Sequence, residues 1–265
     1  MLFTSTFTTI YFLVLAAVLG ACMGSFLNCM AWRIVHGEPF VNGRSHCDKC
    51  GHVLGFADLI PVFSYLAHKG RCRWCGAKLS ARYLWSEVVS ALVFASVVYK
   101  YDITPECLQY LIFVSILLAC SFADLEGFII PDGFIIAAII VRAVFVLLSG
   151  DIVHELVFSL LGGFAVAGGL LLLVTVFEKL IKREAMGGGD IKLIFATGLY
   201  LGWQKNVLCL FAACILGIIF GVITQKKRET QEDARIFPFG PSISAAAALT
   251  LLFGDRFLTW YLGLM

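Results

Sequence analysis

Long apolar stretches separated by polar segments make up most of the chain. Hydropathy predicts eight membrane-spanning helices, at residues 7–32, 84–100, 106–123, 128–149, 155–178, 190–203, 206–224 and 239–262. The segment 33–83 is the only one outside these spans that is large enough to fold by itself. The pattern predicts an all-α polytopic membrane protein with about eight transmembrane helices. We expect a first helix within 1–32, a small domain over 33–83, and a membrane domain over 84–265.

Composition agrees with the hydropathy pattern. Of the 265 residues, 60 % are hydrophobic and only 14 % are charged, and the mean hydropathy is +0.91. A soluble core of this size cannot bury so much apolar surface, whereas a multispanning membrane protein exposes it to lipid. The first apolar run is long enough to span and has no basic segment before it, so we expect no removable signal peptide.

Basic residues gather in alternate loops. The loops 33–83, 179–192 and 225–238 together hold most of the 20 Lys and Arg residues. Because short loops rich in Lys and Arg remain in the cytoplasm, we expect these three loops there and both termini outside. Arg142 lies within a predicted span and is expected to snorkel outward.

Two cysteine pairs lie in the segment 33–83. Cys47-x2-Cys50 and Cys72-x2-Cys75 are separated by 21 residues, and each pair is followed by a glycine. This spacing is typical of a tetrahedral four-cysteine zinc site, and disulfides are the weaker alternative in a reducing cytoplasm. Four thiolates leave no position for water, so the predicted zinc is structural.

The stretch Met186–Leu193 places three glycines, Gly187, Gly188 and Gly189, directly before Asp190 at the start of a short apolar run. An ionisable side chain within a span is by default a candidate for a functional site. The alternative is that Asp190 only caps a helix N-terminus at the membrane surface. Three glycines exceed what a cap needs, and they leave the backbone open to another chain.

A second acidic segment lies between the third and fourth predicted spans. Asp124 ends the third span, at the same membrane face where Asp190 begins another. Glu126 follows in the turn, and Asp132, after Pro131, is expected to cap the next helix.

Two carboxylates that meet at a partly dry face cannot both ionise cheaply, so one retains its proton. The ionised member can activate water, and the protonated member can polarise a carbonyl and then protonate a leaving amine. Asp124 and Asp190 thus form a candidate aspartic peptidase dyad. The sequence has no G-x-S-x-G, H-E-x-x-H or Walker pattern that would favour another chemistry.

The chain resembles the bacterial type IV prepilin leader peptidases, a family of GxGD-type intramembrane aspartic peptidases. The resemblance extends over essentially the whole chain. The matching motifs, in order, are Gly24-Ser25-Phe26-Leu27-Asn28 with Arg33, the two cysteine pairs, Ile60-Pro61-Val62-Phe63-Ser64-Tyr65-Leu66, Gly70-Arg71-Cys72-Arg73, Arg82 to Glu87, Asp124 to Asp132, and Gly187 to Leu193.

The resemblance implies a peptidase of the bacterial inner membrane that removes basic leaders from prepilins or pseudopilins at the cytoplasmic face. It assigns catalysis to Asp124 and Asp190. Many members also methylate the new N-terminus from S-adenosylmethionine, an activity associated with the cysteine-bearing segment, and Glu87 matches a glutamate that we link to it. The expected partners are pilin precursors and the lipid bilayer, with no nucleic acid.

Three alternatives to this bifunctional enzyme remain open. The protein is a peptidase without methyl transfer, or the zinc segment only docks an assembly ATPase. In a different class, a transporter would use the two aspartates as a proton relay. A transporter would be expected to show pseudo-symmetric halves, which the sequence lacks. Beside the dyad, Glu126 or Asp132 is expected to steer a basic leader by its negative charge.

Overall fold

The computed structural model describes residues 6–39, 43–47, 49–182, 186–225 and 238–263. Most of the third basic loop, 226–237, and residues 183–185 of the second lie outside the described residues. The described residues contain helices and two isolated β-bridges, and no longer strand. The chain divides into two compact units, Met1–Phe122 and Ala123–Met265, which are referred to below as unit 1 and unit 2.

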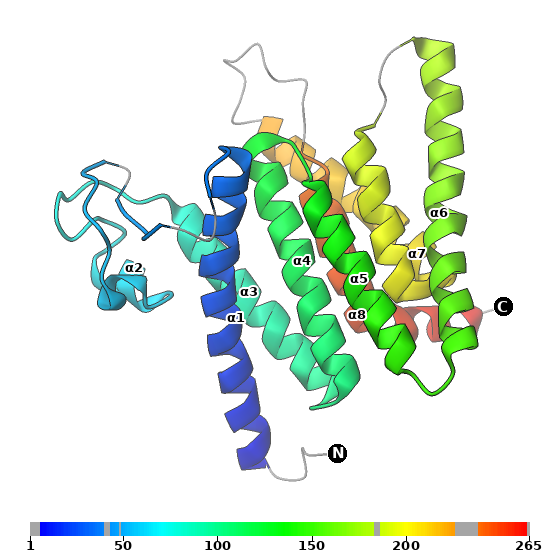
Figure 1. Cartoon of the computed structure of the whole chain (residues 1–265), viewed down its shortest axis with the longest axis horizontal. Helices are drawn as coiled ribbons and strands as arrows, with labels where there is room; N and C mark the ends of the chain where they lie inside the picture. The colour runs from blue at the N-terminus through cyan, green and yellow to red at the C-terminus, as the bar shows by residue number, and fades with distance from the viewer. Residues whose placement is uncertain (1–5, 40–42, 48, 183–185, 226–237, 264–265) are drawn as a thin grey trace. The chain divides into compact units, whose positions relative to one another are not determined.

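Unit 1 contains two long helices that pack closely, α1 (Thr6–Val35) and α3 (Ala81–Tyr101) (Figure 1). The approach depends on Gly20 and Gly24, because a Cβ at either would lie 2.6 Å from a backbone oxygen of α3. Small residues four apart give this kind of close crossing between helices in lipid. The segment between α1 and α3 carries a short 3-10 helix, η1 (Phe56–Leu59), and α2 (Phe63–Ala67).

Helix α4 (Pro105–Gly127) begins in unit 1 and ends in unit 2. Unit 2 continues with α5 (Asp132–Leu148), α6 (Ile152–Ile181), α7 (Gly188–Gln225) and α8 (Gly240–Leu262). Within this unit α7 packs against α5, α6 and α8. Helix α7 therefore links the other helices of unit 2.

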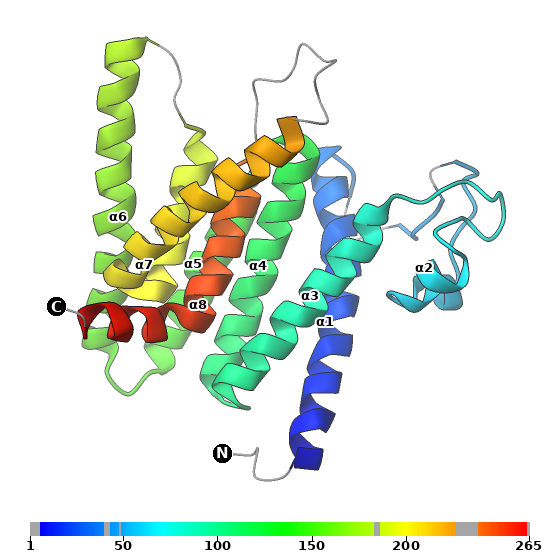
Figure 2. The same cartoon turned by 180° about the vertical axis from the view of Figure 1, so that it is seen from behind.

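Helix α7 is broken at Gly202, whose backbone has φ 73° and ψ 169°. Its two halves run in opposite directions through unit 2, as the yellow and orange segments of Figure 2 show. A side chain at Gly202 would be strained and would overlap Phe158. The predicted spans 190–203 and 206–224 correspond to these two halves, and the turn between them is tighter than predicted.

Helix α6 contains four glycines, and two of them pack closely against α7. The backbones of Gly162 and Gly198 approach so closely that a Cβ on either would overlap the carbonyl oxygen of the other. Gly163 contacts Phe195 and Leu199 of α7, whereas a Cβ on Gly168 or Gly169 would meet nothing within 4 Å. The close packing of α6 on α7 therefore depends on Gly162 and Gly163 and not on Gly168 and Gly169.

The prediction that Arg142 snorkels outward is wrong. The side chain is buried, its Nε donates to Ser159 Oγ at 2.8 Å, and its Nη2 pairs with Glu155 Oε2 at 2.6 Å. A charge inside a membrane protein is stabilised by a partner of opposite sign, and α6 supplies that partner here.

Among the residues that the structure describes, five helices are long and apolar enough to cross a membrane, namely α1, α3, α4, α6 and α7. Many of their large apolar side chains are exposed, including Leu171, Leu172 and Leu173 on α6. Exposed apolar surface on this scale suits contact with lipid tails rather than with water.

Candidate functional site

Asp124 lies in the last turn of α4 and is only 5 % exposed. Its Oδ2 accepts a hydrogen bond of 2.8 Å from the backbone N–H of Gly240, the first residue of α8. A helix start carries free N–H donors and a partial positive charge, so it suits a carboxylate. A Cβ at Gly240 would lie 2.8 Å from the same oxygen, so glycine permits this contact.

Asp190 lies in the first turn of α7 and is half-buried. The helix begins at Gly188, so the alternative in which Asp190 is the N-terminal cap is wrong. The Asp190 N–H donates to the Gly187 carbonyl at 3.1 Å, so Asp190 belongs to the first turn of the helix and does not precede it.

The three glycines before Asp190 have different surroundings. A Cβ at Gly187 would lie 3.2 Å from Asp190 Oδ2, and a Cβ at Gly189 would lie 3.2 Å from Ile130 Cβ. Gly188 has open space around it. Gly187 therefore leaves room for the carboxylate and Gly189 for the segment before α5, while only Gly188 has open space for an incoming chain.

The structure brings Asp124 and Asp190 together within unit 2. Their carboxylates are close enough for the two negative charges to interact. Both come from helix ends, one at the C-terminus of α4 and the other at the N-terminus of α7. Like charges at a partly buried site are the arrangement in which two carboxyl groups share a proton, as in aspartic peptidases.

Asp132 begins α5 beside this pair, but it does not cap the helix. Pro131 occupies the N-cap position, and the Asp132 carboxylate instead pairs with Lys192 Nζ at 2.6 Å. This ion pair joins the starts of α5 and α7 and offsets the charge that was expected to steer a leader. Glu126 lies half-buried in the last turn of α4.

The two cysteine pairs of unit 1 adopt the same local fold. In each, the glycine one position after the second cysteine has positive φ, 68° at Gly51 and 70° at Gly76. The N–H of each glycine donates to the carbonyl of the first cysteine, at 2.8 Å for Cys47 and 2.9 Å for Cys72. The β-bridges His46↔Val53 and Arg71↔Lys78 close the two turns in the same way. Each turn therefore presents two thiols on one side.

The four sulfur atoms of Cys47, Cys50, Cys72 and Cys75 all lie within 4.8 Å of one another, and the cluster could hold a metal ion. The sulfur atoms of Cys47 and Cys75 are 3.9 Å apart. Four thiolates at about 2.3 Å from a tetrahedral zinc would be separated by about 3.8 Å, so the residues fit that metal. Backbone N–H groups of Cys75 and Trp74 lower the pKa of the Cys72 thiol to about 7, which favours the thiolate at this one ligand, whereas burial and the neighbouring cysteines raise the pKa of Cys50 to about 11.

Glu87 lies on α3 in unit 1 and is 8 % exposed. Its Oε2 accepts the N–H of Val62 at 2.7 Å, and the Ser25 hydroxyl bonds to the same carboxylate. Val62 has φ 63°, which is rare for a β-branched residue. Glu87 therefore joins α1, α3 and the loop before α2, all in unit 1, whereas the aspartate pair belongs to unit 2.

Gly240 was missed by sequence reasoning. Gly240 lies within the span predicted at 239–262, and nothing near it in the sequence points to Asp124. The only available signal is a glycine followed by a proline at a helix start, which is common in proteins without such a site.

Two family models match the chain. The Bacterial Peptidase A24 N-terminal domain matches residues 18–101, and the Type IV leader peptidase family matches residues 111–222. The first covers the cysteine turns and Glu87, and the second covers both aspartates.

Several relatives carry the name prepilin leader peptidase/N-methyltransferase. One from Aeromonas salmonicida (strain A449) is 37 % identical over 83 % of this chain and 74 % of its own length. One from Bacillus subtilis (strain 168) is 31 % identical over 92 % of this chain and 96 % of its own. One from Pseudomonas putida is 32 % identical over 93 % and 92 %, respectively. No solved structure matches the chain.

Together the helices and the matches define a multi-pass membrane protein of the peptidase class. The chain belongs to the type IV leader peptidase family.

Proposed function

We propose that this protein removes the leader peptide from type IV prepilins or pseudopilins and then methylates the new N-terminal residue. The observation that carries the peptidase assignment is the meeting of Asp124 and Asp190 at two helix ends within unit 2. Relatives that span most of this chain bear the names of both activities.

The aspartates divide the work of peptide hydrolysis. One carboxylate takes a proton from water, and the resulting hydroxide adds to the scissile carbonyl. The protonated partner donates a hydrogen bond to the carbonyl oxygen and later gives its proton to the leaving amine. The N–H of Gly240 fixes the Asp124 carboxylate for this step, and the open backbone at Gly188 leaves space for an extended peptide.

The four-cysteine cluster is proposed to hold one zinc ion with a structural role. All four ligand positions are thiolates, so no position is open for water, and the cluster lies in unit 1, whereas the aspartates lie in unit 2. S-adenosylmethionine, when bound, supplies a methyl group to the free amine that cleavage creates and leaves as S-adenosylhomocysteine with release of a proton.

Mass spectrometry of a co-expressed prepilin tests both activities at once. Loss of the leader reports cleavage, and the added mass of one methyl group on the mature chain reports methyl transfer. Asp124→Asn and Asp190→Asn should leave the precursor intact. A cleaved but unmethylated product would identify a peptidase without methyltransferase activity, and an intact precursor with wild-type protein would contradict the proposal.

We further propose that the chain crosses the bacterial inner membrane eight times, with both halves of α7 as separate spans and the segment 33–83 in the cytoplasm. The reversal at Gly202 and the basic residues of 33–83 support this topology. A membrane-impermeant maleimide should label Glu106→Cys in intact cells and Arg44→Cys only after permeabilisation. Labelling of Arg44→Cys in intact cells would contradict it.

A further inference from the structure

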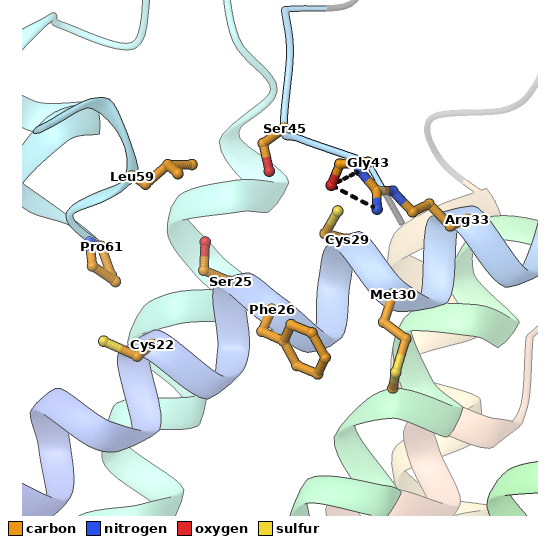
Figure 3. Close-up of a pocket in the computed structure, with 10 residues that line it drawn as sticks. All are labelled: Cys22, Ser25, Phe26, Cys29, Met30, Arg33, Gly43, Ser45, Leu59 and Pro61. Atoms are coloured by element: carbon orange, nitrogen blue, oxygen red, sulfur yellow. Dashed lines mark hydrogen bonds between the residues drawn. The ribbon is translucent and has the colours of Figure 1, made fainter. Parts of the chain in front are cut away.

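A pocket of about 370 Å³ lies in unit 1 between the last four turns of α1 and the described residues Gly43, Ser45, Leu59 and Pro61 of the segment before α3 (Figure 3). Its volume is in the range of small-molecule sites, which is roughly 300–1,000 Å³. Side chains of α1 form one wall and the loop forms the other. The α1 pocket is lined by Cys22, Ser25, Phe26, Cys29, Met30, Arg33, Gly43, Ser45, Leu59 and Pro61.

Arg33 gives the α1 pocket a positive charge at one end. The side chain is only 9 % exposed, and its Nη1 and Nη2 both donate to one acceptor, the Gly43 carbonyl, at 3.4 Å. Among the described residues no carboxylate forms an ion pair with it. A buried guanidinium with one distant acceptor retains donors for an anion, and its planar shape favours a carboxylate.

Ser25 connects the α1 pocket to a negative charge. It lies eight residues before Arg33 on α1, which is about 12 Å along a helix. Its hydroxyl bonds to the buried carboxylate of Glu87, and Gly24 makes this possible because a Cβ there would lie 2.6 Å from the Ser86 carbonyl oxygen of α3. The close crossing of α1 and α3 thus places an acidic group behind Ser25, which is one of the residues that line the pocket.

The loop wall of the α1 pocket is held by the same carboxylate. Glu87 accepts the N–H of Val62, the residue directly after Pro61, and this bond anchors the strained backbone at that point. One glutamate on α3 therefore contacts both walls, Ser25 on α1 and the loop beside Pro61. The carboxylate lies behind the lining residues rather than among them, and its charge reaches the pocket through Ser25.

We propose that the α1 pocket binds S-adenosylmethionine, with the methionyl carboxylate on Arg33 and the cationic part of the molecule toward Ser25 and Glu87. This inference rests on the methyl-transfer part of the proposed function. The ligand carries an anion and cations along its length, and the pocket has Arg33 at one position and Ser25, backed by the Glu87 carboxylate, at another. A phospholipid phosphate would satisfy Arg33 alone, which makes lipid the weaker occupant.

Binding of radiolabelled S-adenosylmethionine to the purified full-length protein in lipid nanodiscs tests the site directly. Arg33→Gln removes the charge and should weaken binding roughly 10-fold or more, because hydrogen bonds to a charged group are lost. Cys29→Phe fills the pocket and should weaken binding while Arg33 is still present. Arg44→Gln is the matched control, since Arg44 is an exposed arginine outside the pocket.

The same preparations should be assayed for cleavage and methylation of a prepilin, with native mass spectrometry for retained phospholipid. The expected result is weakened methyl-donor binding and methylation in both pocket variants, with cleavage retained. Wild-type binding that both variants preserve would overturn the pocket assignment and leave the proposed function standing. Loss of a bound phospholipid in Arg33→Gln, with donor binding unchanged, would assign the pocket to lipid instead. Wild-type protein that neither binds nor methylates would overturn the methyl-transfer function itself.

Discussion

The Asp124 carboxylate accepts its hydrogen bond from Gly240, a residue 116 positions later in the chain. The bond links the end of α4 to the start of α8 and fixes one member of the aspartate pair. We predict that Gly240→Ala lowers cleavage roughly 100-fold, because the added methyl would displace the Asp124 carboxylate from its reactive position. Prepilin cleavage in detergent measures this effect.

Gly169→Ala is the control for that variant. Gly169 is an exposed glycine of α6 with nothing within 4 Å of an added Cβ, so cleavage should remain near the wild-type rate. Methylation of a pre-cut pilin should survive in Gly240→Ala, since Glu87 and the cysteine turns lie in unit 1. A folded Gly240→Ala enzyme with normal cleavage would show that the Asp124 position does not depend on this contact.

The crossing of α6 and α7 provides a prediction about stability. Gly162→Ala should destabilise the protein by about 1–3 kcal/mol or more, because its methyl overlaps the Gly198 carbonyl and the helices must separate. Gly168→Ala, six residues further along the same helix, should have little effect. Thermal unfolding of both variants in the same detergent distinguishes them, and equal transition temperatures would contradict the close crossing.

The features that depend on residues close together in the sequence could be predicted from the sequence alone. Hydropathy located the long helices, although α1 extends to Val35 beyond the predicted end at 32. The cysteine spacing anticipated a cluster because each C-x2-C turn forms from neighbouring residues. The position of each aspartate at a span end was likewise visible, since a span end is itself a local change in polarity.

Features that depend on contacts between distant helices were not predictable. The partner of Arg142 lies on α6, and without it a lone arginine in an apolar span suggested snorkelling. The pairing of Asp132 with Lys192 requires α5 and α7 to begin side by side, which no local pattern encodes. Because the sequence does not show Lys192 beside it, the Asp132 carboxylate was expected to be free to steer a basic leader. Long-range packing decides these cases.

The cysteine cluster predicts a measurable metal content. Protein purified without chelator should contain one zinc per chain, and Cys47→Ser should lose it, because tetrahedral coordination needs all four thiolates. Elemental mass spectrometry provides the measurement, and Cys214→Ser, an exposed cysteine outside the cluster, is the control. Methylation should fall more than cleavage, since metal binding stabilises the fold of unit 1 while the aspartates lie in unit 2. Metal-free wild-type protein would be incompatible with this assignment.

The aspartate pair predicts both a pH profile and a pattern of non-additivity. Hydrolysis needs one ionised and one protonated carboxyl group, so cleavage should fall at low pH, where both carry a proton, and at high pH, where neither does. The two apparent pKa values of this bell-shaped profile belong to the pair rather than to Asp124 or Asp190 alone.

Asp124→Asn and Asp190→Asn should each reduce cleavage roughly 100- to 10,000-fold, because neither remaining aspartate can both activate water and protonate the leaving amine. The double variant should be little worse than either single variant, since the two groups act as a unit. Each variant must first be shown to be folded, for example by retained zinc and an unchanged unfolding transition. A folded Asp190→Asn enzyme that still cuts a prepilin at an appreciable rate would remove the dyad mechanism, because Asp124 alone would then be sufficient.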